Sequence, residues 1–173
     1  VIYENTRALE IKENLVVTSG GNITANNIVV ATHYPIMNAP GYYFMKMHQE
    51  RSYVLALENT SEIDGMYIDL NKEGYSFRTY NNLLLLGGIS HRTGENEEGG
   101  SYDELRKVAK RLYPKAKEKY YWSAQDCMTI DGIPYIGRYS SETPNIYVAT
   151  GFNKWGMTSS MVSAMIISDM ILE

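Results

Sequence analysis

Two segments near the carboxyl end of the chain are the most informative about its fold. They are Asp131-Gly132-Ile133-Pro134-Tyr135-Ile136-Gly137 and Ile146-Tyr147-Val148-Ala149-Thr150-Gly151-Phe152-Asn153-Lys154-Trp155-Gly156. The apolar residues before Gly151 predict a short buried strand. The segment from Met157 to Leu172 predicts a helix, with Thr158, Ser159 and Ser160 as its caps. Glycines at both ends of the turn let backbone N–H groups approach a ligand, and a helix amino terminus favours an electron-rich group. The alternative is a turn with a purely structural role, because such a turn has the same sequence features.

Residues 1–41 form a first region. Its strand candidates are Tyr3–Ile11, Leu15–Thr18 and Ile28–Ala31, with a turn at Gly20-Gly21-Asn22. Three helix- and strand-breaking residues then follow, Pro35, Pro40 and Gly41. We interpret them as the end of this region.

Residues 42–125 form a second region with a different pattern. Its strand candidates are Ser52–Leu57, Gly65–Asp69, Tyr75–Tyr80 and Leu83–Gly88. Asn81-Asn82 is a hairpin signal, and Ser101-Tyr102-Asp103-Glu104 is a capping box that begins a helix ending before Pro114. Four strands and one helix predict an antiparallel sheet with a helix packed on it, and therefore an α+β chain. Residues 126–173 complete it with the strand, turn and helix described above.

The composition excludes several classes of protein. Hydrophobic residues make up 44% and charged residues 21% of the 173 positions, as in a globular protein, and a net charge of −4 argues against nucleic-acid binding. The last helix is too short and too polar to span a bilayer. A single cysteine cannot form an internal disulfide and indicates a reducing, cytoplasmic setting. His33, His48 and His91 have no metal-ligand spacing, so we expect no metal site.

The two runs together carry a resemblance to a known family. The order Asp-Gly-x-Pro-x-x-Gly, a spacer, a buried strand and then Thr-Gly before a helix resembles the carboxyl-terminal signature of the FAD-dependent oxidoreductases of the D-amino-acid oxidase, glycine oxidase and sarcosine oxidase superfamily. Upstream, Asn22 to Thr32 resembles the strand that ends in Ala-Thr-Gly in that family, with His33 in place of the glycine. Arg78 and the strand from Leu83 to Gly88 resemble the sheet of its substrate domain.

The resemblance implies a cofactor, a reaction and a set of contacts. Residues 1–41 and 126–173 would belong to an FAD-binding α/β domain, and residues 42–125 would be a substrate-binding domain. The reaction would be oxidation of the C–N bond of an amine or amino acid by hydride transfer to flavin N5. The flavin contacts expected from the motif are Gly151, Phe152, Trp155, Gly156, Met157 and Thr158; no residue is assigned as catalytic. A reading of Lys154 and Trp155 as a plain exposed loop pair remains open.

Two departures from the family pattern bear on the substrate and on the flavin linkage. Glycine-oxidase-like members carry an arginine five residues before the Asp-Gly pair to hold a substrate carboxylate, and this chain has Asp126 there. A carboxylate attracts an ammonium group, so we expect a preference for amines, with Tyr53, Arg78, Asp126 and Lys154 around the substrate; Lys154 leaves a carboxylate substrate open. Cys127 does not fall at the spacing of members that tether FAD, so we expect non-covalent FAD.

One expected element is missing from the sequence. The family holds the FAD diphosphate with an amino-terminal Gly-x-Gly-x-x-Gly turn, which does not occur in these 173 residues. Together with the absence of a starting Met, this indicates a fragment that would be inactive alone. Some relatives with a similar Gly-Phe-x-Lys-Trp-Gly segment continue into a Rieske iron–sulfur module, which is a candidate partner. The alternative is a non-catalytic α/β binding or assembly domain with the same architecture.

Overall fold

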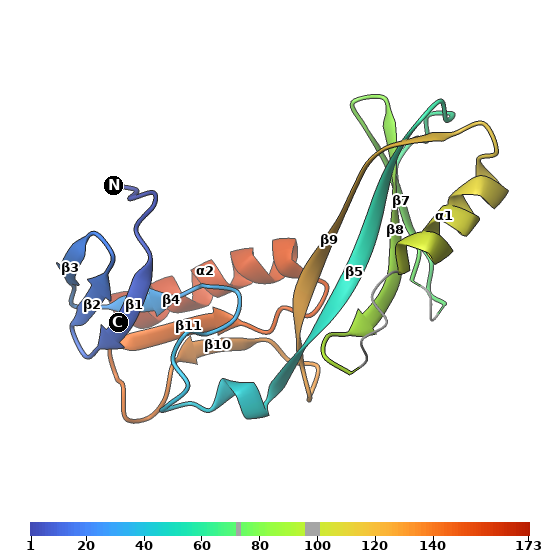
Figure 1. Cartoon of the computed structure of the whole chain (residues 1–173). Coiled ribbons are helices and arrows are strands. Elements are labelled where there is room, and N and C mark those ends of the chain that lie inside the picture. The colour runs from blue at the N-terminus through green and yellow to red at the C-terminus, as the bar shows by residue number, and fades with distance from the viewer. Residues whose placement is uncertain (72–73, 96–100) are drawn as a thin grey trace. The chain divides into compact units, whose positions relative to one another are not determined.

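The computed structural model describes residues 1–71, 74–95 and 101–173, the side chain of Ser101 excepted, and it divides into two compact units (Figure 1). Unit 1 comprises Val1–His48 together with Cys127–Glu173, and unit 2 comprises Gln49–Asp126. The chain leaves unit 1 along strand β5 (Met47–Glu58) and returns along β9 (Lys117–Thr129). Unit 1 is therefore built from the two ends of the chain.

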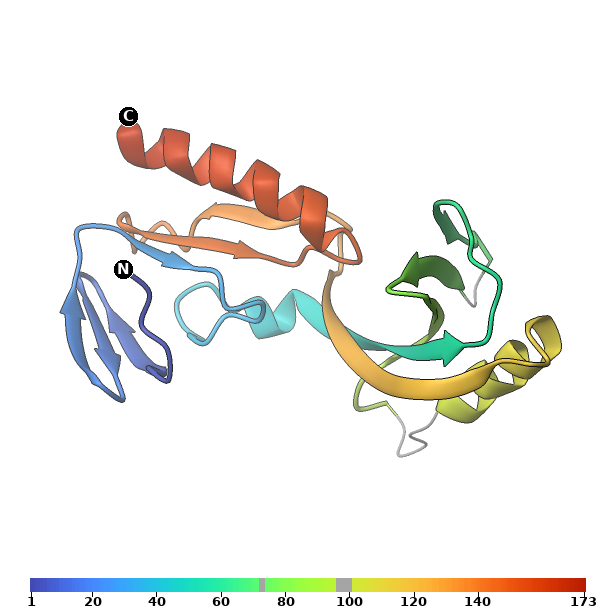
Figure 2. The same ribbon diagram turned by 90° about the horizontal axis from the view of Figure 1, so that it is seen from above.

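Unit 1 contains two three-stranded sheets, one long helix and one turn of 3-10 helix. The first sheet has the order β1 (Ala8–Lys12), β2 (Leu15–Thr18), β3 (Gly21–Thr24), all antiparallel. The second has the order β10 (Tyr135–Arg138), β11 (Ile146–Thr150), β4 (Ile28–Val30), with β4 parallel to β11 and β10 antiparallel to it. Helix α2 (Gly156–Leu172) packs on β10 and β11 (Figure 2), and η1 (Tyr43–Met45) precedes β5.

The core of unit 1 joins segments that are far apart in the sequence. Ile28 and Val30 of β4 pack with Ile146 and Val148 of β11, and Tyr43 and Tyr139 close the same cluster. The Tyr43 hydroxyl donates a hydrogen bond to the Tyr139 carbonyl at 2.9 Å. Burial and the neighbouring rings of Tyr43 and Tyr34 raise the pKa of Tyr139 to about 12, so this phenol stays neutral and serves the packing.

Unit 2 is a five-stranded antiparallel sheet with a helix on one face. The strand order is β6 (Met66–Ile68), β7 (Ser76–Tyr80), β8 (Leu83–Arg92), β5, β9, and helix α1 (Ser101–Leu112) packs against β8. Asn81 and Asn82 both have positive φ, at 47° and 62°, as a two-residue β7–β8 hairpin loop requires. Leu55, Leu86 and Leu105 have no exposed surface and hold the helix on the sheet.

The structure confirms the α+β class, with an antiparallel sheet and packed helix followed by the strand–turn–helix. It also contains strands that the sequence pattern did not predict, β10 and, more instructively, β3 and β9. β3 begins at Gly21, inside the predicted turn, and its four residues are exposed, so no apolar alternation marks it. The thirteen-residue β9 is exposed over its first six residues and mixes lysine, glutamate and aromatic side chains. Both are edge strands, where burial imposes little pattern.

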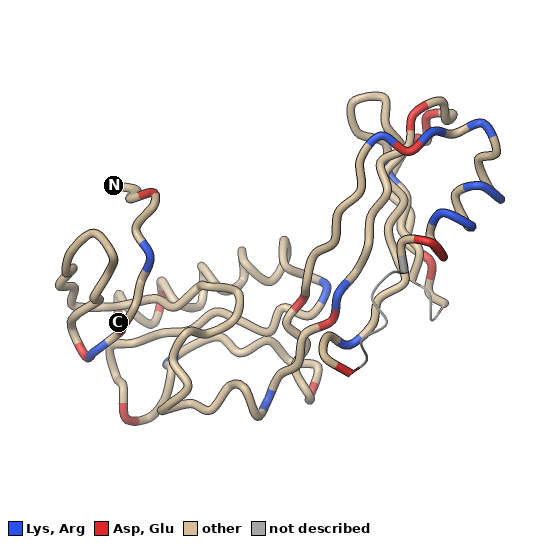
Figure 3. Tube along the Cα trace, viewed as in Figure 1, with Lys and Arg blue, Asp and Glu red and all other residues tan. Residues whose placement is uncertain are grey.

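Charge is unevenly distributed along the chain (Figure 3). Helix α1 carries acidic residues in its first turn and basic residues in its last, which complements the helix dipole. Helix α2 carries a single charged residue, Asp169, in seventeen positions. Within the described ranges, no helix combines the length and the apolar character that crossing a bilayer requires.

Arg106 ties α1 to the β9 strand. Its guanidinium donates two hydrogen bonds to the Glu118 carboxylate, at 2.8 and 3.0 Å, and one to Asp103 at 3.0 Å. It also lies over the rings of Tyr102 and Tyr121, 5.7 and 5.4 Å from their centroids. These contacts connect the solvent side of α1 to the sheet edge.

We expect the Glu118 contact to make unit 2 acid-sensitive. The hydrogen bond from Arg106 lowers the pKa of Glu118 below its usual value of 4.5. A group whose pKa is lower in the folded protein stabilises it above the unfolded value, and this contribution is lost as pH falls through the folded pKa. Thermal unfolding of Glu118→Gln should therefore occur below the wild-type midpoint at neutral pH, with the gap closing below pH 4.5.

Glu10→Gln provides the control for this prediction, because it removes a carboxylate from the exposed Glu10–Lys12 pair at 3.2 Å. Exposed pairs of this kind contribute little. An equal and pH-independent effect of both substitutions would contradict the prediction.

Candidate functional site

The parallel pair β4 and β11 defines the edge at which the site lies. Ile28 aligns with Ile146 and Val30 with Val148, so the two strands end at the same side of the sheet. At this edge the hydroxyl of Thr150, the last residue of β11, donates a hydrogen bond to the carbonyl of His33, which follows β4. In open α/β sheets, ligands bind outside the carboxyl ends of parallel strands.

Gly151, directly after β11, is required by both conformation and space. Its φ is +69°, in the left-handed region that favours glycine. A Cβ atom at this position would lie 2.4 Å from Cγ2 of Thr129 and 3.3 Å from Sδ of Met47. The chain can therefore turn here only because residue 151 has no side chain.

Asn153 holds the turn in place and was not predicted from the sequence. It has a φ of +51°, and its backbone N–H donates to the Cys127 carbonyl at 3.0 Å. Its Oδ1 accepts the Thr129 N–H at 3.0 Å, and its Nδ2 donates to the Gly132 carbonyl at 3.2 Å. One side chain thus joins the Gly151–Gly156 turn to the Asp-Gly-x-Pro segment. The tolerance of asparagine for left-handed backbone was the available signal.

The amino terminus of α2 follows the turn. The helix begins at Gly156, and Trp155 occupies the cap position without a side-chain hydrogen bond to the helix. The prediction that Thr158, Ser159 and Ser160 cap the helix is wrong, because they lie inside it. Ser160 instead donates to the Met157 carbonyl at 2.9 Å. Because Trp155 provides no side-chain cap, the N–H groups of the first helical turn and the positive end of the helix dipole are directed toward the Gly151–Gly156 turn.

A cavity of about 530 Å³ lies in unit 1 between α2 and the face of β4 and β11. Its wall is mostly apolar, with serine hydroxyls along α2; the lining residues are Val29, Ala31, His33, Ala149, Thr150, Gly151, Phe152, Ser160, Ser163, Ala164, Ile167, Ser168 and Ile171. The cavity therefore joins the two strand ends, the Gly151 turn and the face of α2 from Ser160 to Ile171 in one space.

The flavin contacts expected from the sequence share this turn and helix start. Gly151 is buried, and Phe152 is half-buried against Tyr147, Ala149 and Ile167. Trp155 is 67% exposed and Met157 89% exposed, and Gly156 and Thr158 are also exposed. Their role as flavin contacts stays a prediction. Lys154 is exposed in the same turn.

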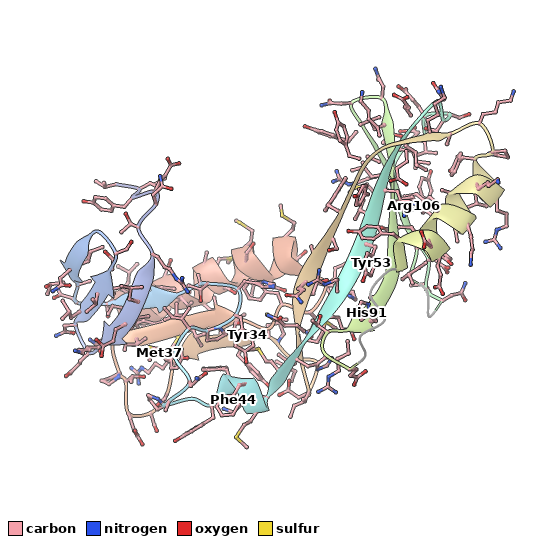
Figure 4. All side chains as sticks on the ribbon, in the orientation of Figure 1. Tyr34, Met37, Phe44, Tyr53, His91 and Arg106 are labelled. Atoms are coloured by element: carbon pink, nitrogen blue, oxygen red, sulfur yellow. The ribbon has the colours of Figure 1, made fainter. Side chains whose placement is uncertain are left out.

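The other residues predicted for the substrate belong to unit 2. Tyr53 is 3% exposed and packs between the sheet and α1, with its ring 5.7 Å from His91 and 4.6 Å from Tyr102 (Figure 4). This packing does not favour a substrate contact. Arg78 is exposed on β7 and points to the face opposite Phe77, because side chains alternate along a strand. Asp126 is half-buried at the end of unit 2.

The structure adds two facts about the chemistry of unit 1. Cys127, for which no flavin linkage is predicted, is 1% exposed within the core cluster. Among the residues that the structure describes, no group of three or more His, Cys, Asp and Glu side chains is placed to hold a metal ion.

Comparison with known proteins agrees with this geometry. The sequence matches the family described as FAD dependent oxidoreductase (DAO) over residues 1–170. It is 39% identical over 180 residues to a Bacillus subtilis protein named provisionally as the Rieske 2Fe-2S iron-sulfur protein YhfW, covering 98% of this chain and 35% of that protein. It is 24% identical to Bacillus subtilis glycine oxidase, covering 99% of this chain and 49% of the enzyme.

Solved structures share the fold. The crystal structure of glycine oxidase from Geobacillus kaustophilus matches with a TM-score of 0.77 at 21% identity, covering 98% of this chain and 48% of that one. L-proline dehydrogenase from P. horikoshii matches with a TM-score of 0.74 at 20% identity, covering 96% of this chain and 50% of the enzyme.

The chain belongs to the FAD dependent oxidoreductase family, as the match over residues 1–170 shows. Within that family its fold corresponds to about half of a glycine-oxidase-like structure. The chain spans about a third to a half of the length of the curated relatives it matches.

Proposed function

We propose that this chain is the substrate-side half of an FAD-dependent oxidoreductase that oxidises the C–N bond of an amine or amino acid. The observation that carries the proposal is the Gly151 turn, which leads from the end of a parallel strand to a helix amino terminus without a side-chain cap. We call this chain together with a nucleotide-binding half the complete oxidoreductase. FAD would bind it without a covalent link, and the nucleotide-binding half would hold most of the cofactor.

Helix α2 supports the need for a second half. A helix whose apolar side chains point in several directions normally buries more than one face. Here only Ser163 and Ile167 are buried, while Met157, Met161 and Met165 are 89%, 66% and 67% exposed. These methionines follow one another at four-residue spacing and form an uncovered stripe next to the cavity-lining serines.

Strand β4 points to the same conclusion. The Ile28 N–H donates to the Asn145 carbonyl beside β11, so the next residue, Val29, presents its N–H and C=O groups to the other side. β4 is the last strand of its sheet, and the Val29 side chain is 46% exposed between the buried Ile28 and Val30. Parallel strands normally lie inside a sheet covered on both faces. A further parallel strand from the nucleotide-binding half would complete this sheet.

The site residues fit the cofactor by their donor chemistry. When bound, FAD supplies the acceptor for the hydride of the substrate C–H bond. The N–H groups of Gly156, Met157 and Thr158, with the positive end of α2, would stabilise negative charge on a pyrimidine oxygen. Gly151 permits close approach of the backbone, and Phe152 and Trp155 would exclude water. The chain would thus act by orientation and electrostatics, with no acid or base assigned.

For the substrate we propose a primary amine or polyamine over a simple α-amino acid. Asp126 carries this preference, because its carboxylate attracts an ammonium group and repels a substrate carboxylate. Lys154 supplies the basic group for a substrate that carries an acid. Relatives named for amino-acid oxidation, such as glycine oxidase, support a small nitrogen-containing substrate in general.

The electron acceptor is a separate proposal. The 39% identical relative that carries a Rieske name favours a Rieske iron–sulfur module as the route for electrons, in place of direct reaction with oxygen. Anaerobic reduction by substrate, followed by reoxidation with oxygen or with the iron–sulfur module, separates the two acceptors. Fast reoxidation by oxygen alone would contradict the Rieske route.

The proposed function is tested by purifying the complete oxidoreductase and recording its absorption spectrum. We expect a yellow protein with one FAD per chain, released intact by acid or heat, which putrescine or glycine bleaches under anaerobic conditions. A colourless protein that takes up no added FAD would overturn the proposal and favour the non-catalytic assembly domain. FAD that stays attached to denatured protein would contradict the non-covalent linkage.

A further inference from the structure

His33 is the feature of the cavity that the proposed function does not use. It follows β4 and has a φ of +65°, in the left-handed region that side-chain-bearing residues enter at a cost. Backbone strain of this kind gathers at functional sites, where surrounding contacts hold it in place. Here the Thr150 hydroxyl donates to the His33 carbonyl, and Thr150 is 2% exposed. The backbone of His33 is therefore fixed to the end of β11.

His33 differs chemically from the other residues of the cavity wall. Among the described residues that line the cavity, His33 alone has a side chain that can carry a charge; the others are apolar, glycine or hydroxyl-bearing. The imidazole is exposed and belongs to a residue at the carboxyl end of a parallel strand. A bound dinucleotide brings an anionic diphosphate, whose oxygens accept hydrogen bonds from N–H groups.

We propose that His33 is a cofactor-binding residue whose imidazole donates a hydrogen bond to the diphosphate of FAD. The inference rests on the proposed function. His33 and Gly151 lie at the same end of the cavity, where the Thr150 hydroxyl donates a hydrogen bond to the His33 carbonyl. Both would therefore contact FAD from the carboxyl ends of β4 and β11, with the Gly151 turn serving the flavin ring and His33 serving the diphosphate. The histidine in place of the family's glycine then keeps the left-handed backbone and adds a polar contact from this half of the enzyme.

The test compares two ligands on two variants of the complete oxidoreductase. Protein stripped of flavin is titrated with FAD and with riboflavin, which has the ring and ribityl chain but no phosphate. We expect His33→Gly to raise the Kd for FAD about tenfold, as loss of one hydrogen bond to a charged group implies, and to leave the Kd for riboflavin unchanged. His33→Asn keeps a donor on a shorter side chain and tolerates the same backbone, so its loss should be smaller.

Thermal unfolding of the flavin-free variants controls for structural damage. Glycine fits the left-handed backbone without strain, so His33→Gly should unfold at the wild-type temperature or above it. A Kd for FAD within twofold of wild type in both variants would overturn the contact, and so would an equal loss for riboflavin. Wild-type protein that binds no FAD would overturn both the proposed function and this contact. If wild-type protein and both variants bind FAD equally well, only the proposed contact is overturned.

Discussion

Gly151→Ala should destabilise the protein by about 3 kcal/mol, one of the two largest effects that we expect from a single substitution. Two costs add together. A left-handed backbone costs a residue with a Cβ roughly 1–2 kcal/mol, and forcing an extra methyl group into a packed site costs about 1–3 kcal/mol. At Gly151 φ is +69°, and the new Cβ would lie 2.4 Å from Cγ2 of Thr129. Urea unfolding measures the change as a lower midpoint at constant slope.

Gly156→Ala is the matched control for this prediction. Gly156 is the first residue of α2, its φ is not positive, and a Cβ at this position would meet no heavy atom within 4 Å apart from its chain neighbours and the backbone of its own helix. Alanine is a better helix former than glycine, so this substitution should be neutral or stabilise by up to about 1 kcal/mol. Equal destabilisation by the two substitutions would show that the geometry of residue 151 has no special role.

The two costs at Gly151 are separable in a double variant. Thr129→Ser removes the Cγ2 methyl that the new Cβ would strike and keeps the hydroxyl, which lies 3.4 Å from Oδ1 of Asn153. Gly151→Ala in the Thr129→Ser background should therefore cost less than in wild type, with the backbone part of the penalty remaining. The difference between the two measurements is the steric part.

Much of this site follows from the sequence because its elements are local. A buried strand, a glycine and a helix in immediate succession define β11, the Gly151 turn and α2, and the hairpin at Asn81-Asn82 defines β7 and β8 in the same way. Local patterns of burial and turn chemistry are visible along one stretch of chain. The family resemblance carried by these residues is confirmed by the match over residues 1–170.

The rest depends on contacts between distant residues, which one stretch of sequence does not reveal. Asn153 is meaningful only because Thr129 and Gly132 lie beside it. Tyr53 is expected around the substrate, and its burial comes from α1, which begins some fifty residues later in the chain and packs over it; its contact with substrate stays a prediction. The predicted caps of α2 failed because a non-polar residue, Trp155, takes the cap position. Edge strands such as β9 carry little burial pattern.

The second large effect concerns Asp126. In the complete oxidoreductase, Asp126→Asn should lower kcat/KM for putrescine about 10- to 100-fold, because a hydrogen bond between charged groups contributes roughly 1.5–3 kcal/mol and each 1.4 kcal/mol is a factor of ten. The amide keeps the size of the side chain and loses the charge. Turnover of glycine or sarcosine should fall less or rise, since the substitution also removes repulsion of a carboxylate.

Asp126→Arg reverses the charge at this position and tests whether residue 126 selects between amines and amino acids. A guanidinium at this position would hold a carboxylate through two parallel hydrogen bonds, so the ratio of kcat/KM for glycine to that for putrescine should rise well above the wild-type ratio. Asp64→Asn, which neutralises an exposed carboxylate in the loop before β6, is the control and should leave the ratio unchanged. If wild-type protein turns over glycine or sarcosine at least as fast as putrescine, Asp126 does not select amines. The substrate carboxylate must then be held by another group, for which Lys154 is the candidate.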